Sequence, residues 1–197
     1  MDGMVVLIVH TLIVLWVFLG MTFSYTLKRA NRHYAAGKIK APSVKYFSRL
    51  SKVLFVSNML LTLLSFWYVS PYMLPIFSSD LGRAAGVSLV LFGFVMLKKS
   101  FGALGNNYSP MFDAFFPREL VTAGVYQRVR HPIYLYNLCV SFGLALASGL
   151  GVVLISSLIG FAFVLRAIHV EETYLMAHFD QYADYKKRTN RLVPFLF

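Results

Sequence analysis

A histidine, a proline and two tyrosines lie at the start of an apolar run, in the stretch Gly124-Val-Tyr-Gln-Arg-Val-Arg-His-Pro-Ile-Tyr134. Proline biases the preceding residue away from helical dihedral angles and suits the first position of a helix, so a helix should begin at Pro132, with His131 beside its free N–H groups. A helix N-terminus attracts anions. The combination of this helix N-terminus with the rings of Tyr126 and Tyr134 indicates a site for a ligand that has a carboxylate and an aromatic or cationic part. An interfacial tyrosine belt with a capping histidine is the structural alternative.

A second group of ionisable side chains lies near the end of the last apolar run and comprises Arg166, His169, Glu171 and Glu172. In a helix the first two share a face with Glu172, while Glu171 points about 100° away. Ionisable residues at membrane depth are costly and indicate a functional site. Because both groups fall on the same predicted side of a bilayer, we expect them to form one pocket. The structural alternative is that the glutamates simply pair with Arg166 or with interfacial lysines.

The composition is that of a polytopic membrane protein. Of the 197 residues, 58% are hydrophobic and only 14% are charged, with a mean hydropathy of +0.64, outside the range of ordinary soluble domains. The formal net charge of +11 does not indicate a nucleic-acid partner, because the basic residues lie in the loops between apolar runs, as positive-inside topology requires. The single cysteine, Cys139, excludes an intramolecular disulfide framework and a cysteine-rich zinc site, and no metal site is expected.

Windows of about 20 apolar residues predict an all-α integral membrane protein with about five transmembrane helices. These spans cover approximately residues 4–27, 50–70, 83–104, 132–148 and 151–173. The small residues at 147–151 should fold the last two spans into a tight antiparallel hairpin. Residues 1–197 are expected to form a single membrane domain, because the sequence shows no linker that would set off a soluble module.

The distribution of lysine and arginine predicts the orientation of the spans. Nearly all of these residues flank the span ends on one side, and only Arg83 falls on the other. The N-terminus should therefore be outside and the C-terminus cytoplasmic. The connector at about 105–131 and the tail at about 174–197 then face the cytoplasm together with both polar groups.

The tail carries aromatic residues at a spacing of three, namely Phe179, Tyr182 and Tyr185, among charged residues. This pattern is typical of an amphipathic helix that lies on the membrane interface. A purely anchoring role would explain the tail by itself. Together with the two polar groups, the interfacial helix is expected to help form a cofactor pocket.

Several short motifs follow one another along the second half of the chain. They are Asn107-Tyr-Ser-Pro110, Glu119-Leu-Val-Thr-Ala-Gly-Val-Tyr126, Arg130-His-Pro-Ile-Tyr134, Glu171-Glu-Thr-Tyr-Leu175 and Tyr182-Ala-Asp-Tyr-Lys-Lys-Arg188, followed by Pro194. The ordered set resembles the isoprenylcysteine carboxyl methyltransferases, within the wider group of integral membrane methyltransferases that includes phospholipid N-methyltransferases. It covers about residues 105–197. The short five-span form is similar to a prokaryotic member, which implies a multi-pass protein of the cytoplasmic membrane with its active site facing the cytoplasm.

The resemblance implies S-adenosylmethionine as the cofactor, in a pocket built from the connector, the hairpin helices and the tail. Carried over by motif, the cofactor-binding residues are Tyr108, Leu120, Val121, Tyr126, His131 and Tyr134. The resemblance also implies that Glu171 or Glu172 holds the amino group or the ribose of the cofactor. The sequence leaves open which of the two glutamates faces the ligand.

The chemistry of methyl transfer suggests how the remaining residues would act. Transfer from a sulfonium is an in-line displacement, and an acceptor carboxylate is already deprotonated near pH 7. Catalysis then rests on alignment and exclusion of water, with a cation to position the carboxylate. Arg166 is the candidate for that task, with His169 and Arg188 as helpers in substrate binding. Together with Arg166, the residues Glu171 and Glu172 are the predicted catalytic groups.

We therefore expect a protein-S-isoprenylcysteine carboxyl O-methyltransferase-like enzyme. Its lipophilic prenylcysteine-type acceptor would enter laterally from the membrane lipids, and no obligate protein partner is evident. Three alternatives stay open: a methyltransferase for a phospholipid amine or another lipophilic acceptor, a membrane reductase with a nicotinamide cofactor, and a non-enzymatic polytopic scaffold or small transporter. Paired broken helices, a usual sign of transporters, are not apparent in the sequence.

Overall fold

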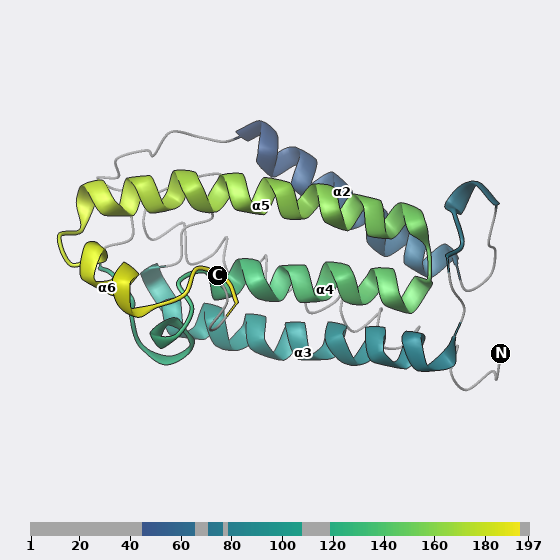
Figure 1. The fold of residues 1–197 in the computed structure, drawn as a ribbon, viewed down its shortest axis with the longest axis horizontal. Helices are drawn as coiled ribbons and strands as arrows, with labels where there is room; N and C mark the ends of the chain where they lie inside the picture. Colours follow the sequence, from purple (N-terminus) through teal and green to yellow (C-terminus); the bar gives the residue numbers. More distant parts are fainter. Residues whose placement is uncertain (1–44, 66–70, 77–78, 108–118, 194–197) are drawn as a thin grey trace.

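The computed structural model describes residues 45–65, 71–76, 79–107 and 119–193. Within these ranges the secondary structure is helical apart from turns and two isolated β-bridges. The helices are α2 (Lys45–Leu64), α3 (Asp80–Leu104), α4 (Pro132–Ser148), α5 (Gly151–His178) and α6 (Tyr182–Arg188), with short 3-10 turns at η1 (Pro71–Met73), η2 (Gly105–Asn107) and η3 (Gly124–Gln127). In Figure 1, α3, α4 and α5 run along the long axis with α4 in the middle, and α6 lies at the end where α5 finishes.

The observed helices agree with the predicted spans where the two can be compared. The bounds of α4 are those predicted, α5 continues past 173 to His178, and α2 and α3 each begin a few residues early. Among the described helices, α3 and α5 are long and apolar enough to cross a membrane, and α4 is apolar but shorter, with 17 residues. The predicted span at 4–27, and residues 66–70 of the predicted span at 50–70, lie outside the described residues. The number of spans and the orientation of the termini therefore stay predictions.

Local sequence explains where two of the helices begin. The Ser79 hydroxyl accepts a hydrogen bond from the backbone N–H of Gly82 at 3.0 Å, and Asp80 lies in the first turn of α3. A side-chain cap and an acidic residue both stabilise a helix N-terminus. α4 begins with Pro132, as predicted, and His131 occupies its N-cap position without donating or accepting a side-chain capping hydrogen bond. The imidazole is therefore free to serve another contact.

The turn between α4 and α5 is as tight as its small residues predict. Gly149 has a left-handed φ of 68°, which glycine adopts without steric cost, and its N–H donates to the carbonyl of Ala145 at 3.0 Å. The neighbouring loop holds the turn from outside, because the N–H of Gly151 donates to the carbonyl of Leu74 at 2.7 Å and that of Ile76 donates to the carbonyl of Gly149 at 3.0 Å. The hairpin is therefore fixed at its closed end.

Glycines allow α3 and α4 to approach closely. A Cβ atom placed on Gly86 would lie 2.4 Å from the backbone nitrogen of Ala147, and one placed on Gly143 would lie 2.8 Å from the carbonyl oxygen of Gly86. A Cβ atom on Gly93 would lie 2.8 Å from a methyl group of Val140. Small residues at such contacts are the usual way in which membrane helices gain packing energy, because lipid supplies no hydrophobic driving force between them.

A buried polar contact joins α2 to α5. The Asn58 amide donates to the Ser157 hydroxyl at 3.5 Å, and both side chains are buried. The Thr62 hydroxyl donates to the Asn58 carbonyl at 2.7 Å. Within the described part of the chain, the amide oxygen of Asn58 has no hydrogen-bond partner. The hydrogen bond between α2 and α5 is therefore long, and it leaves one hydrogen-bond acceptor of the buried amide unpaired.

Two of the three aromatic residues of the tail, both in α6, face the protein, which corrects the predicted contact of these two rings with the membrane interface. Phe179 is half-buried at the end of α5. Tyr182 and Tyr185 of α6 are 1% and 4% exposed, and the Tyr185 hydroxyl donates to the carbonyl of Tyr126 in η3 at 2.7 Å. Just after α6, the carbonyl of Asn190 accepts the N–H of Arg130 at 2.9 Å, in a short parallel bridge to the connector. An amphipathic pattern specifies a polar and an apolar face, and here the connector covers the apolar one.

Candidate functional site

The two groups of ionisable residues predicted from the sequence meet at one end of the helical bundle. His131, at the start of α4, places Nε2 3.3 Å from Oε1 of Glu172 and Nδ1 3.7 Å from Oε2 of Glu171, both on α5. The Tyr134 hydroxyl donates to the same Glu171 oxygen at 2.9 Å, and its ring centre lies 5.7 Å from that of His131. The first turn of α4 and the last part of α5 therefore form one site.

Glu172 is the centre of this site. It is 4% exposed, and a buried carboxylate needs paired charges and hydrogen bonds to offset its desolvation. Three cations supply them: Arg130 Nε at 2.9 Å, Arg191 Nη2 at 3.1 Å and Lys186 Nζ at 3.4 Å. One carboxylate thus joins α5 to the connector and to the tail. We call Arg130, His131, Tyr134, Glu171, Glu172, Lys186 and Arg191 the polar cluster.

Arg130 also holds the tail directly. Its Nη1 donates to the backbone carbonyl of Lys186 at 3.0 Å and to that of Thr189. These carbonyls belong to the C-terminal end of α6, where backbone acceptors have no helical partner and favour a cation. The Arg130 side chain is 7% exposed. One guanidinium therefore fixes α5 and α6 to the connector from inside the protein.

The tyrosines beneath the polar cluster are kept in their neutral form. Burial raises the pKa of the Tyr185 hydroxyl well above its ordinary value. Burial, and after it the negative charge of Glu172, raises the pKa of the Tyr182 hydroxyl further. Among the described residues, the Tyr182 hydroxyl has no hydrogen-bond partner. Neither tyrosine therefore carries charge at physiological pH.

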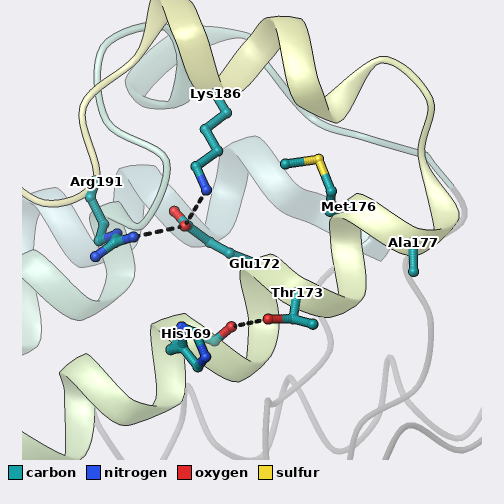
Figure 2. Close-up of a pocket in the computed structure, with 7 residues that line it drawn as sticks. All are labelled: His169, Glu172, Thr173, Met176, Ala177, Lys186 and Arg191. Atoms are coloured by element: carbon teal, nitrogen blue, oxygen red, sulfur yellow. Dashed lines mark hydrogen bonds and ion pairs between the residues drawn. The ribbon is translucent and has the colours of Figure 1, made fainter.

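A pocket of about 520 Å³ opens beside the polar cluster, between α5 and the tail. It is lined by His169, Glu172, Thr173, Met176, Ala177, Lys186 and Arg191. Figure 2 shows Lys186 and Arg191 reaching toward Glu172 from the tail side, with His169 and Thr173 on the adjoining turns of α5. This volume lies within the range of small-molecule sites, about 300–1,000 Å³.

Some of the predicted substrate-binding residues lie elsewhere. Arg166 is exposed and does not line the pocket. This corrects the prediction that it shares a helical face with Glu172, because a separation of six residues turns it about 120° from Glu172. Arg188 is also exposed and donates through Nε to the carbonyl of Asp184 at 3.2 Å. His169 lines the pocket and is exposed. The roles of these three residues stay predictions.

The predicted cofactor residues of the connector are placed less directly. Leu120 and Val121 are half-buried in the segment before η3, and Tyr126 is 6% exposed, with its carbonyl bound to α6. Tyr108 lies outside the described residues. None of the three described residues lines the pocket, so their cofactor role stays a prediction.

Three residues of the site had no predicted role: Arg130, Lys186 and Arg191. In the sequence they contributed only to the distribution of positive charge that predicts membrane topology, or stood within a motif without a role of their own. Arg130 could have been found, since it precedes His131 directly and so must share its surroundings. Lys186 and Arg191 contact Glu172 from 14 and 19 positions away, a pairing that no local pattern reveals.

Comparisons with known proteins identify the family. The family model of the phospholipid methyltransferases matches residues 81–182, just over half of the chain. The chain belongs to the phospholipid methyltransferase family. The matched region runs from the start of α3 into α6 and includes His131, Tyr134 and both glutamates of the polar cluster.

Two individual proteins are similar to this member of the family. The cobalt-zinc-cadmium resistance protein CzcN of Cupriavidus metallidurans is 32% identical over 111 residues, which are 55% of this chain and 51% of that protein. The chain thus spans about half the length of this curated relative. The solved structure of the eukaryotic intramembrane Ras methyltransferase ICMT, an isoprenylcysteine carboxyl methyltransferase, matches with a TM-score of 0.57 at 21% identity, over 76% of this chain and 53% of that one.

The match to ICMT shows a shared fold, and it confirms, with the family model, the resemblance predicted from the ordered motifs. In its described residues this member of the phospholipid methyltransferase family is therefore all-helical, and its family and its two long apolar helices indicate an integral membrane protein. The family favours a methyltransferase over the nicotinamide-dependent reductase and over the non-enzymatic scaffold or small transporter that the sequence left open.

Proposed function

We propose that the protein is an integral membrane methyltransferase that uses S-adenosylmethionine to methylate the carboxylate of a lipophilic, prenylcysteine-type acceptor. The observation that carries the proposal is the convergence of α4, α5 and the tail on the polar cluster, beside a pocket of about 520 Å³, in a chain of a methyltransferase family. The concentration of basic residues at this end supports a cytoplasmic site, because positive charge is retained on the cytoplasmic side. A bacterial relative supports a prokaryotic cytoplasmic membrane.

The residues of the polar cluster fit the charges of S-adenosylmethionine. This molecule carries a carboxylate, an ammonium, a sulfonium and an adenosine. Glu171, with a side chain 35% exposed, is engaged by Tyr134 and His131 through Oε2 alone among the described residues, so its other oxygen suits the ammonium or the sulfonium. The ring of Tyr134 offers a face for a cation. Glu171, Tyr134 and His131 would therefore hold the cofactor, with Leu120 and Val121 as apolar neighbours.

The chain need not supply a general base for this reaction. Bound S-adenosylmethionine supplies an electrophilic methyl group, and an acceptor carboxylate is ionised near pH 7. The residues of the site then have to orient the acceptor and exclude water from the line of transfer. Glu172, fixed by three cations, and the docked tail provide a rigid wall for that purpose.

The bilayer gives a lipophilic acceptor access to the site. Large apolar side chains on α3 and α5 are exposed on the outside of the bundle and include Leu91, Phe92, Val95, Ile155, Leu158 and Ile159. Such a surface on a membrane protein is covered by lipid. An acceptor with an isoprenoid or acyl chain would travel along it and reach the polar end of the bundle from the side.

A phospholipid amine is the second candidate acceptor. An ammonium must lose a proton before it can accept a methyl group, and His169 lines the pocket as an exposed imidazole that could take that proton. The family description names phospholipids. The two candidates differ in their product, since a methyl ester is cleaved by mild base and an N-methyl group is not.

The test uses purified protein in lipid, S-adenosylmethionine labelled on its methyl group, and N-acetyl-S-farnesylcysteine or phosphatidylethanolamine as acceptor. We expect base-labile label on the first acceptor, and its loss in Glu171→Gln. Asp180→Asn, an exposed acid outside the pocket, is the matched control and should keep activity. Base-stable label on the phospholipid would select the amine reaction, and no transfer to either acceptor would contradict the proposal.

A further inference from the structure

The chain itself occupies every acceptor position of the Glu172 carboxylate. Oε1 faces Arg130 Nε at 2.9 Å and His131 Nε2 at 3.3 Å, and Oε2 faces Arg191 Nη2 at 3.1 Å and Lys186 Nζ at 3.4 Å. A carboxylate offers about four lone-pair positions, so these four contacts fill it. A ligand cation would have to displace one of them. Glu172 is therefore not the group that receives the positive charge of a ligand.

The partners of Glu172 differ in their exposure. The side chains of Arg130 and Glu172 are 7% and 5% exposed, so they form a closed pair whose charges cancel. The side chains of Lys186 and Arg191 are 40% and 31% exposed and line the pocket. Glu172 is the only carboxylate among the described lining residues, and Arg130 already balances it. The pocket therefore has an excess of positive charge.

Lys186 and Arg191 are held next to each other because both contact the same Glu172 oxygen (Figure 2). The ammonium of Lys186 has three N–H donors, and its contact with Glu172 uses one. The others are available to an acceptor atom in the pocket. With the guanidinium of Arg191 beside it, this ammonium attracts an anion with oxygen acceptors, and charge-assisted hydrogen bonds of this kind are among the strongest in proteins.

Part of the pocket lining from α5 is apolar. Met176 and Ala177 form this part, and Met176 is 42% exposed. A free inorganic anion would leave this apolar surface in water. A carboxylate joined to an apolar body would cover it while its charged end contacts Lys186.

We propose that Lys186 and Arg191 form a binding subsite for a carboxylate joined to an apolar body, and that Glu172 is the positioning residue that holds both cations in place. The inference rests on the proposed function, since it assigns the anion of one of the two reactants. That carboxylate belongs either to the acceptor or to the cofactor. Both present the same chemistry to Lys186.

The experiment compares Lys186→Gln with Lys187→Gln in the full chain reconstituted in lipid. Lys187 is the next residue of α6, its side chain is 76% exposed, it pairs with Asp184, and it does not line the pocket. Calorimetry measures binding of N-acetyl-S-farnesylcysteine and its carboxamide, and of S-adenosylmethionine and its decarboxylated form. No turnover is needed, so the result is independent of the proposed reaction.

We expect Lys186→Gln to weaken binding of one carboxylate about tenfold, as for the loss of one charge-assisted hydrogen bond, while Lys187→Gln binds as wild type. A loss confined to the farnesylcysteine and absent for its carboxamide assigns the subsite to the acceptor. A loss confined to S-adenosylmethionine and absent for its decarboxylated form assigns it to the cofactor. Equal binding by both variants, or no binding of either carboxylate to wild type, overturns the inference.

Glu172→Gln tests the positioning role by the sign of its effect. The substitution removes a negative charge and therefore makes the pocket more positive. If Glu172 holds the two cations in place, the preference for carboxylate over carboxamide should fall about tenfold or more. If Glu172 merely opposes the anion, that preference should rise. A change in thermal stability alone, with the preference unchanged, would leave Glu172 a structural residue and overturn this part of the proposal.

Discussion

Arg130→Met should release the tail from the bundle. The substitution keeps an unbranched apolar side chain but removes the contacts to the Glu172 carboxylate and to the carbonyls of Lys186 and Thr189. Hydrogen bonds to charged groups contribute about 1.5–3 kcal/mol each. Because Lys186 is half-exposed, water can replace part of the lost hydrogen bond to its carbonyl. Lys186 and Arg191 keep the Glu172 carboxylate paired. We therefore expect the tail to lose about 3 kcal/mol of docking free energy.

Hydrogen exchange measures this loss directly. A loss of about 3 kcal/mol should raise the exchange rates of amides in residues 182–191 roughly a hundredfold, with little change in α4. Arg128→Met is the matched control, because Arg128 is exposed in the same connector and its side chain makes no hydrogen bond or ion pair to the described part of the tail. Arg130→Lys should recover only part of the protection, since an ammonium lacks the fork that reaches three acceptors. Unchanged exchange of the tail in Arg130→Met would refute the reasoning.

Three further predictions concern the fold. Gly86→Ala should lower the melting temperature in lipid, because the new Cβ atom meets the α4 backbone at 2.4 Å, whereas Gly102→Ala, with open space around it, should be neutral or stabilising by up to about 1 kcal/mol; equal effects would contradict the close packing. The raised pKa of the Tyr185 hydroxyl means that its stabilising effect is complete below about pH 10 and is lost as the pH rises further. Thermal unfolding between about pH 9 and 11.5 should therefore depend less on pH in Tyr185→Phe, and an unchanged slope would exclude this tyrosine as the cause. Asn58→Leu should be neutral or stabilising by about 1 kcal/mol, since it removes a buried amide oxygen without a partner in the described residues; strong destabilisation would show that the link to Ser157 is essential.

The sequence predicted best what short-range chemistry determines. Pro132 set the start of α4 and Gly149 its end, because proline and left-handed glycine act within one turn of the chain. The sequence also predicted that His131 and Glu172 belong to one site, since both are ionisable residues in apolar surroundings. Local rules sufficed for these cases because each depends on a residue and its immediate neighbours.

Pairing across the chain could not be predicted. Arg130 contacts a glutamate 42 residues later, and the cations of the tail reach the same carboxylate only after α6 has folded back. The sequence revealed the aromatic pattern of the tail, but it predicted that Tyr182 and Tyr185 contact the membrane interface, and they are buried against protein. The pattern alone cannot distinguish the two, because lipid and protein both cover apolar faces. Arg166 was favoured because its spacing suggested one helical face shared with His169 and Glu172, but each step of three residues turns the face by about 60°, and two steps carry Arg166 away from the pocket.

The Arg130–Glu172 pair divides the site into two parts of different local stability. Arg130 precedes the α4–α5 hairpin and Glu172 lies in the last turns of α5, so this closed pair of opposite charges joins the open ends of the hairpin without any residue of the tail. Lys186 and Arg191 reach Glu172 from the tail, and their side chains line the pocket. Because proteins open locally in cooperative units, undocking of the tail would remove these two lining residues while the hairpin keeps its neutral pair. Such a molecule would retain a folded membrane region and lack a complete pocket.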